Sequence, residues 1–197
     1  MRGERVKRSL AGLAIASSLL LLHSAVAAQQ PLPAVATCNA CHGPEGNSQI
    51  PLTPSLAGQP KLFVENQLVL IREGLRDVPQ MKEIVTGMSD ETIVALAQHY
   101  AAQALTYKPG APNREKTRLG AATASKMLCG TCHLSDYKGQ NQVPRLAGQD
   151  ETYLVHSMKQ FRDNPGPGRD TIMAAVLYGL NDADLANLAH YLSTFKP

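Results

Sequence analysis

The sequence contains two copies of a short motif in which two cysteines stand three residues apart and a histidine follows at once. The six residues of the two motifs are Cys38, Cys41, His42, Cys129, Cys132 and His133. The second copy begins 91 positions after the first, and together the copies use all four cysteines of the chain. Paired thiols at this spacing serve as zinc ligands, as a redox-active pair or as attachment points for a haem.

Haem attachment explains these motifs better than the other uses do. A zinc ribbon would separate its two pairs by roughly 15 to 20 residues, and a thioredoxin-like pair would stand among alternating strands and helices. Structural disulfides are common in exported proteins, but they leave both adjacent histidines unexplained. On one helical turn, both thiols reach the vinyl groups of one haem as thioethers and the histidine reaches its iron. We therefore expect two covalently attached haem c groups, with His42 and His133 as iron ligands.

Residues 1–27 are predicted to be a secretory signal peptide. A basic start precedes an apolar run from Leu10 to Leu22, and residues 25–27 form a small-x-small cleavage site. The apolar run is shorter than the roughly 20 residues that span a bilayer, which argues against an uncleaved anchor. We expect export to the periplasm and a mature chain that begins near Ala28.

The charge balance of the rest of the chain excludes one class of partner. Overall composition is that of an ordinary globular protein, with 44% hydrophobic and 18% charged residues. The basic excess belongs to the predicted signal peptide, because residues 29–107 carry seven acidic and four basic residues and residues 108–197 carry eight acidic and eleven basic ones. Nucleic-acid binding therefore has no support from charge.

The second half of the chain repeats the first. The stretch PSLAGQ at residues 54–59 matches PRLAGQ at residues 144–149, and Phe63 matches Tyr153, with an offset of 90 to 92 residues throughout. A stretch with two prolines, a glycine and several charges lies between the halves. We predict a first domain over 28–107, a linker over 108–118 and a second domain over 119–197.

Each half has the apolar spacing of helices and lacks the alternation typical of strands. One helix is expected from a first-turn proline at Pro60 to Gly74, with a counterpart that starts at Asp150. A last helix is expected after Ser89 in the first half and after Asn181 in the second. The residues that recur at helical spacing in these last helices are Ile93, Leu96, Ala97, Tyr100, Leu185, Leu188, Ala189 and Leu192. The predicted fold class is all-α.

With these motifs, the sequence resembles class I cytochromes c in tandem, and most specifically the two-haem cytochrome c4 family. The resemblance covers the whole chain after the signal peptide and follows one order of motifs. Cys-x-x-Cys-His is followed by Pro-x-Leu-Ala-Gly-Gln, by a methionine, and by a glycine and an aspartate before the last helix. It implies two class I cytochrome c domains, each wrapped around one haem and packed close enough for internal electron transfer. The chain has no Trp, which in many single-haem relatives binds a haem propionate.

Met81 and Met173 are the predicted sixth ligands of the two irons. They occupy matching positions in the two halves, each six residues before a glycine, whereas Met88 matches Leu180 and is expected in the core. The family pattern also places the axial thioether here. The resemblance further implies that the carbonyls of Pro54 and Pro144 accept the N–H of the axial histidines.

The remaining methionines and histidines of the predicted mature chain are expected to have structural roles. Met127 and Met158 are expected to pack in the protein. His99, His156 and His190 are expected on the surface or on helix faces, away from iron.

Histidine and methionine ligands close both axial positions, leave no site for a substrate and suit single-electron transfer. We expect a periplasmic electron carrier rather than an enzyme. It would take electrons from a quinol-oxidising complex or a dehydrogenase and pass them to an oxidase or a reductase, with membrane association only through such partners. A haem subunit bound tightly to a flavoprotein or other dehydrogenase is an alternative. A two-haem peroxidase is a weaker one, because it needs an iron position that can open.

Overall fold

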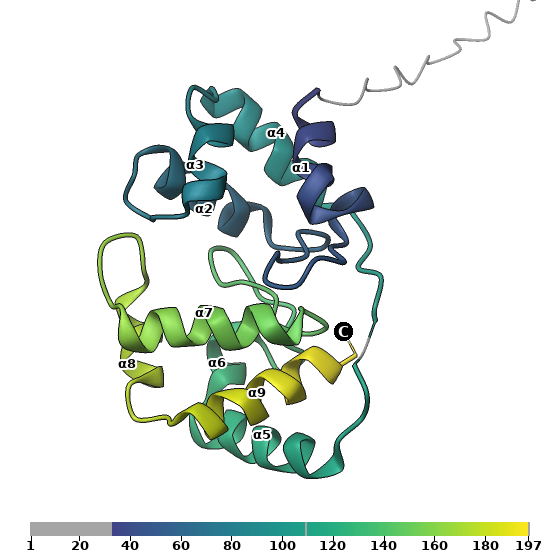
Figure 1. Ribbon diagram of the computed structural model, residues 1–197, viewed down its shortest axis with the longest axis vertical. Coiled ribbons are helices and arrows are strands. Elements are labelled where there is room, and N and C mark those ends of the chain that lie inside the picture. The colour runs from purple at the N-terminus through teal and green to yellow at the C-terminus, as the bar shows by residue number, and fades with distance from the viewer. Residues whose placement is uncertain (1–32, 109, 197) are drawn as a thin grey trace, which may run out of the picture. The chain divides into compact units, whose positions relative to one another are not determined.

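The computed structural model describes residues 33–108 and 110–196, so the predicted signal peptide lies outside the described residues (Figure 1). Within those two ranges the regular structure is helical, apart from one isolated bridge between Gln140 and Val143. This confirms the all-α prediction. Among the described residues, no helix combines the length and the apolar character needed to cross a membrane.

The first repeat contains four α-helices and one short 3-10 helix among its described residues. They are α1 (Pro33–His42), η1 (Pro44–Gly46), α2 (Lys61–Arg72), α3 (Pro79–Val85) and α4 (Asp90–Ala101). Helix α4 packs against α2 and touches α1. A small core of Val35, Cys38, Leu96 and Tyr100 joins α1 to α4.

The described residues of the second repeat form five α-helices. They are α5 (Arg114–Lys126), α6 (Cys129–His133), α7 (Glu151–Asp163), α8 (Thr171–Leu177) and α9 (Asp182–Thr194). Helix α5 begins at Arg114, inside the segment predicted as a linker, because the Asn113 side chain accepts the N–H of Lys116 and caps the helix. Helix α9 packs against both α5 and α7.

The predicted starts of the last helices are confirmed. Ser89 caps α4 by accepting the N–H of Thr92, and Asn181 exchanges two hydrogen bonds with Asp184 at the start of α9. The apolar residues predicted to share one face of each helix are all buried. The prediction for Pro60 was one residue early: its ψ of 133° is extended, so it precedes α2 instead of forming its first turn.

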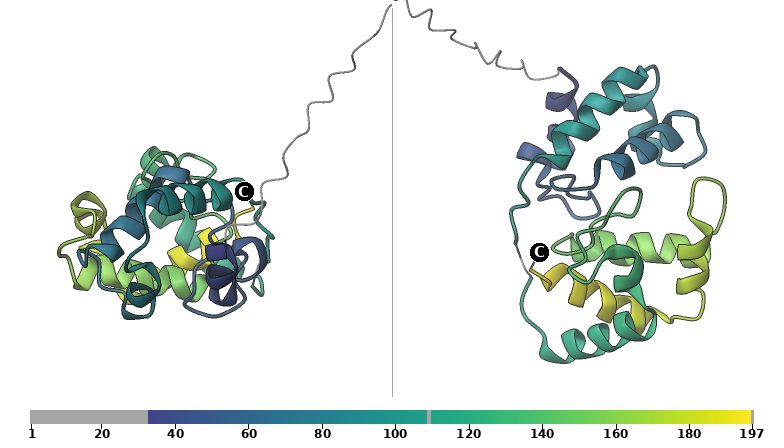
Figure 2. Two further views of the ribbon diagram at one scale, coloured as in Figure 1. Left: turned by 90° about the horizontal axis from the view of Figure 1, so that it is seen from above. Right: turned by 180° about the vertical axis from the view of Figure 1, so that it is seen from behind.

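Helices α5 and α9 cross at a glycine. They lie side by side in Figure 1 and in the right-hand view of Figure 2, and their contact is the most extensive between any two described helices. A Cβ atom at Gly120 would lie 2.2 Å from the backbone oxygen of Asn187 and 2.6 Å from Cβ of Tyr191. The absence of a side chain at Gly120 therefore sets how closely the helices approach.

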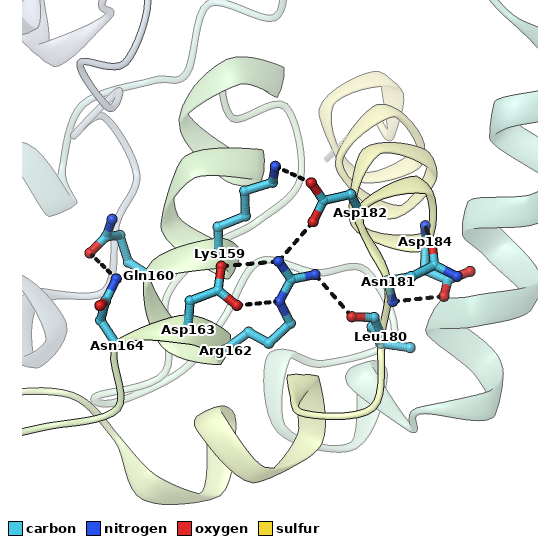
Figure 3. Close-up of polar contacts among 9 residues, drawn as sticks. All are labelled: Lys159, Gln160, Arg162, Asp163, Asn164, Leu180, Asn181, Asp182 and Asp184. Atoms are coloured by element: carbon cyan, nitrogen blue, oxygen red, sulfur yellow. Dashed lines mark hydrogen bonds and ion pairs between the residues drawn. The ribbon is translucent and has the colours of Figure 1, made fainter.

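An arginine at the end of α7 holds the segment that returns from α8 to α9 (Figure 3). The Arg162 guanidinium donates to the carbonyl of Leu180 at 3.0 Å and to the Asp182 carboxylate at 2.7 Å. The guanidinium also donates two hydrogen bonds to the Asp163 carboxylate, and Lys159 donates to Asp182 at 2.5 Å. Lys159 and Arg162 lower the pKa of Asp182 by hydrogen bonding to its charged form.

The first repeat contains the same contact at the equivalent position. Arg72, in the last turn of α2, donates to the carbonyl of Met88 and to the Asp90 carboxylate, both at 2.8 Å. In each repeat, therefore, an arginine ties the end of the loop that carries the short helix α3 or α8 to the start of the last helix. The segments with Met81 and Met173 lie within these two closed loops.

We expect Gly120→Ala to destabilise the second repeat. The added methyl group would meet backbone atoms, and such overpacking costs about 1–3 kcal/mol, more than the gain in helix propensity of roughly 1 kcal/mol. Chemical denaturation of the haem-loaded protein measures the change. Gly179→Ala is the control, since nothing lies within 4 Å of a Cβ there, and an unchanged stability in Gly120→Ala would contradict the account of the crossing.

We expect Arg162→Gln to loosen residues 171–181, because the Leu180 carbonyl loses its charged donor. Hydrogen exchange followed by mass spectrometry should show amides of this segment exchanging several-fold faster, while residues 79–88 stay unchanged. Arg72→Gln should give the converse pattern. Arg118→Gln, which removes an exposed pair with Glu115 in α5, should change neither segment. Equal effects of Arg162→Gln on both loops would rule out a local clamp.

Candidate haem sites

Each motif histidine is the last residue of a helix and is hydrogen-bonded to a proline carbonyl of its own repeat. His42 ends α1 and His133 ends α6, and both are 6% exposed. Nδ1 of His42 lies 2.8 Å from the carbonyl oxygen of Pro54, and Nδ1 of His133 lies 2.8 Å from that of Pro144. These are the two contacts that the resemblance implies.

These contacts fix the tautomer of both rings. Burial lowers the pKa of His42 and of His133, although the bond to the carbonyl opposes this shift. A neutral ring that faces a carbonyl must carry its proton on Nδ1, since a carbonyl can only accept. The lone pair of Nε2 is then free for a metal in both repeats.

None of the four cysteines is paired in a disulfide, and two of them are turned into the protein. Cys38 is buried and Cys129 half-buried, whereas Cys41 and Cys132 are exposed. Burial raises the pKa of the Cys38 and Cys129 thiols. Within each repeat the two thiols stand one helical turn apart, immediately before the histidine. Each pair can therefore form two thioethers on the same side as the histidine.

Met81 and Met173 lie at equivalent places in the fold. Met81 is in α3 and Met173 in α8, and both side chains are half-buried. Met173 packs against the core of the second repeat, and the Asp170 side chain accepts its backbone N–H at 2.8 Å. Met88 and its counterpart Leu180 pack against the cores of their own repeats, as predicted.

The other methionines and histidines have structural places. Met158 is 5% exposed in the core of the second repeat, and Met127 is half-buried. His156 is exposed. His190, predicted on a helix face, is 3% exposed: its ring donates to Glu151 at 3.0 Å and accepts the N–H of Asn113 at 3.2 Å. It thereby holds the start of α5 against α9.

The two repeats meet through a reciprocal pair of glutamines that the sequence did not single out. Gln149 accepts the backbone N–H of Ser55 at 2.8 Å and donates to its carbonyl at 2.9 Å. Gln59 accepts the N–H of Arg145 at 2.9 Å and donates to its carbonyl at 3.2 Å. Both glutamines are at most 4% exposed. The sequence did contain a sign of this contact, because the repeated Leu-Ala-Gly-Gln stretch ends in a glutamine in both repeats.

Arg145 is the main chemical difference between the two loops at this contact. It occupies the position equivalent to Ser55, is 3% exposed, and donates to the carbonyls of Ala147 at 2.5 Å and Ser55 at 3.3 Å. Burial lowers its pKa to about 10, so the guanidinium is charged at neutral pH. Within residues 33–108 and 110–196, no carboxylate forms an ion pair with it.

Comparison with protein-family models supports two cytochrome domains. The model described as "Cytochrome c" matches residues 118–196, and the one described as "Cytochrome C oxidase, cbb3-type, subunit III" matches residues 34–99. Each match covers most of one predicted repeat and includes one Cys-x-x-Cys-His motif.

Relatives of known type extend over both repeats. The chain is 31% identical to cytochrome c4 of Pseudomonas aeruginosa over 181 residues, covering 87% of this chain and 90% of that one. It is 28% identical to the "Thiosulfate dehydrogenase electron acceptor" of Thiomonas intermedia over 172 residues, covering 82% and 79%. The solved structure of reduced cytochrome c4 from Pseudomonas stutzeri matches with a TM-score of 0.75 and 27% identity, covering 82% of this chain and 95% of that one.

The residues of both repeats fit a covalently bound haem. Each repeat offers two free thiols one turn apart and a neutral histidine whose Nδ1 is bonded and whose Nε2 is free. Together with the two domain matches and the relatives, this supports two haem c groups in the chain. The chain belongs to the cytochrome c4 family of two-haem electron-transfer cytochromes.

Proposed function

We propose that this protein is a periplasmic electron carrier that uses both haem groups and has no substrate site of its own. The observation that carries the proposal is that the proposed iron ligands occupy equivalent positions in the two repeats. Each has a buried histidine held by a proline carbonyl at 2.8 Å and a methionine at the same place in a clamped loop. Two like sites suit a carrier of single electrons, whereas a two-haem peroxidase needs two unlike irons.

The proposed iron ligands are His42 and Met81 in the first repeat and His133 and Met173 in the second. Pro54 and Pro144 orient the histidine rings and raise the basicity of Nε2. Cys38, Cys41, Cys129 and Cys132 form the thioethers. A bound haem supplies reversible one-electron chemistry, and a thioether ligand favours its ferrous state. With a histidine and a methionine holding each iron, oxygen and peroxide would have no place to bind.

The proposed partners are redox proteins on either side of the carrier. Donors would be a quinol-oxidising complex or a dehydrogenase, and acceptors an oxidase or a reductase. The proposed haem domains cover residues 28–107 and 119–197, and the last residues of the linker proposed at 108–118, from Arg114 on, belong to α5. The predicted signal peptide over residues 1–27 supports export to the periplasm.

A haem subunit bound tightly to a dehydrogenase is the second candidate function. The similarity to a protein named as a thiosulfate dehydrogenase electron acceptor favours it. In that role the two haem domains would receive electrons from one fixed partner. The proposed iron ligands would be the same in this role as in a free carrier.

We expect Met81→Ala and Met173→Ala each to remove about half of the thioether-to-iron charge-transfer band. This weak band of the oxidised protein lies near the red end of the visible spectrum and reports sulfur ligation. Each substitution leaves one iron with its methionine and the other without. The absorption spectrum of the ferric protein, normalised to haem content, measures the loss.

Met88→Ala is the matched control, because Met88 packs against the core next to the proposed ligand loop. The Met88→Ala protein should keep the full charge-transfer band. If Met88→Ala removed half of the band and Met81→Ala did not, the alignment of the two repeats would be wrong in this loop.

We expect the purified protein to restore electron flow from quinol to oxidase when it is added to membranes from cells that lack this protein. A free carrier should wash off these membranes at high salt, since screening weakens surface charge contacts. Oxygen uptake with and without the added protein measures the function. Co-elution with a dehydrogenase at high salt, without any restored oxygen uptake, would instead establish the bound-subunit role.

A further inference from the structure

The carbonyl that accepts from each motif histidine belongs to a peptide group whose N–H is also bonded. The carbonyl of Pro54 and the N–H of Ser55 are the two ends of one peptide group. The His42 ring donates to the carbonyl end at 2.8 Å, and the N–H end donates to the side-chain oxygen of Gln149 at 2.8 Å. Gln149 lies in the second repeat, so this chain of bonds crosses between the repeats.

The reverse connection is also present. The peptide group between Pro144 and Arg145 accepts from His133 at 2.8 Å and donates to the side-chain oxygen of Gln59 at 2.9 Å. Gln59 lies in the first repeat. Each glutamine therefore bonds to the peptide group that holds the histidine of the opposite repeat.

Hydrogen bonds in such a series strengthen one another. The peptide group is conjugated, so drawing its N–H toward an acceptor places more negative charge on its carbonyl oxygen. Condensed-phase estimates give a cooperative strengthening of about 10–30% per bond, and each hydrogen bond is electrostatically stronger where water is excluded. Both histidines are 6% exposed, and Gln59 and Gln149 are 4% and 2% exposed, so the two ends of each series are shielded from water.

A stronger acceptor at Nδ1 changes the properties of Nε2. Pulling the Nδ1 proton toward the carbonyl makes the imidazole more electron-rich, and an electron-rich ligand favours ferric over ferrous iron. The glutamine at the far end of the series thereby adds to the stabilisation of the oxidised state. Its removal should weaken the carbonyl as an acceptor and favour the reduced state.

We propose that Gln59 and Gln149 are positioning residues that tune the iron of the opposite repeat through these shared peptide groups. The proposal rests on the proposed ligation by His42 and His133. Gln59 gives the cleaner case, because both hydrogen bonds of its side chain go to Arg145. Gln149 also accepts the N–H of Asp150 at 3.0 Å, next to the start of α7.

The test is Gln59→Met, which keeps the length of the side chain and removes its hydrogen bonds. At a fixed ambient potential, we expect the ratio of ferric to ferrous iron in the Cys129 repeat to fall about threefold. For one electron this is a rise in potential of about 28 mV, at 59 mV for each tenfold change. The ratio in the Cys38 repeat should stay unchanged. The Nδ1 proton signal of His133 should move upfield as its hydrogen bond weakens.

A redox titration followed by NMR separates the two irons, because each set of haem signals can be assigned through contacts with the ring of His42 or His133. Gln149→Met should shift the Cys38 repeat in the same direction. Gln59→Glu retains an acceptor oxygen, so its ferric-to-ferrous ratio should not fall. Gln98→Met, on the exposed face of α4, should leave both repeats unchanged.

A shift confined to the repeat that carries the substitution, an equal shift in both repeats, or no shift would overturn the proposal. So would a fall in Gln59→Glu as large as that in Gln59→Met. The unchanged protein must first show histidine-ring signals shifted by both irons. Their absence would overturn the proposed ligands and this inference together, whereas their presence without a crossed shift would overturn the inference alone.

Discussion

The bond from the ring of each motif histidine to a proline carbonyl is the interaction on which the rest of the structure depends. A buried imidazole with a free Nε2 is useful to a metal only if the other nitrogen is bonded and the ring is held in one orientation. His42 and His133 meet this condition at 2.8 Å from Pro54 and Pro144. The loop that supplies each carbonyl must then be rigid. Its backbone is bonded in the same way in both repeats: Gly46 accepts from Leu56 and Ala57, and Tyr137 from Leu146 and Ala147.

The same loops also form the boundary between the repeats, which explains why that boundary is polar. Backbone groups of Ser55 and Arg145 are buried there and must find partners, since an unsatisfied buried group costs about 1–3 kcal/mol. Gln59 and Gln149 provide both a donor and an acceptor to each of them. An apolar residue at position 59 would leave both backbone groups of Arg145 without these partners, and one at position 149 would leave the N–H of Ser55 without its partner. The requirement for a rigid histidine support and the requirement for a satisfied boundary therefore fall on the same few residues.

The sequence predicted most of the fold because its signals were local. The cysteine motifs, the caps at Ser89 and Asn181 and the helical spacing in α4 and α9 each lie within a few residues, and the structure bears out the helix signals. Contacts between distant residues were harder to predict. Nothing near Arg72 or Arg162 in the sequence indicates that each bonds a carbonyl at least 16 positions away. The sequence showed only that Gln59 and Gln149 occupy the same place in the two repeats. It did not show their contacts, because their partners lie 86 to 94 positions away in the other repeat. The predicted linker at 108–118 includes charged residues at 114–118 that look like a linker, whereas the Asn113 cap begins α5 there.

The two repeats have the same proposed iron ligands, but the surroundings of these ligands differ. The contacts of Gln59 and Gln149 are reciprocal, but the residue between proline and leucine is Ser55 in one loop and Arg145 in the other. Arg145 places a buried positive charge at the boundary and donates a second hydrogen bond to the carbonyl of Ser55. In a medium of low dielectric constant, one such charge alters the energy of a nearby electron far more than an exposed charge does. Two irons with the same proposed ligands can therefore differ in potential for a reason that lies outside the ligands, at the one position where the stretches 54–59 and 144–149 differ.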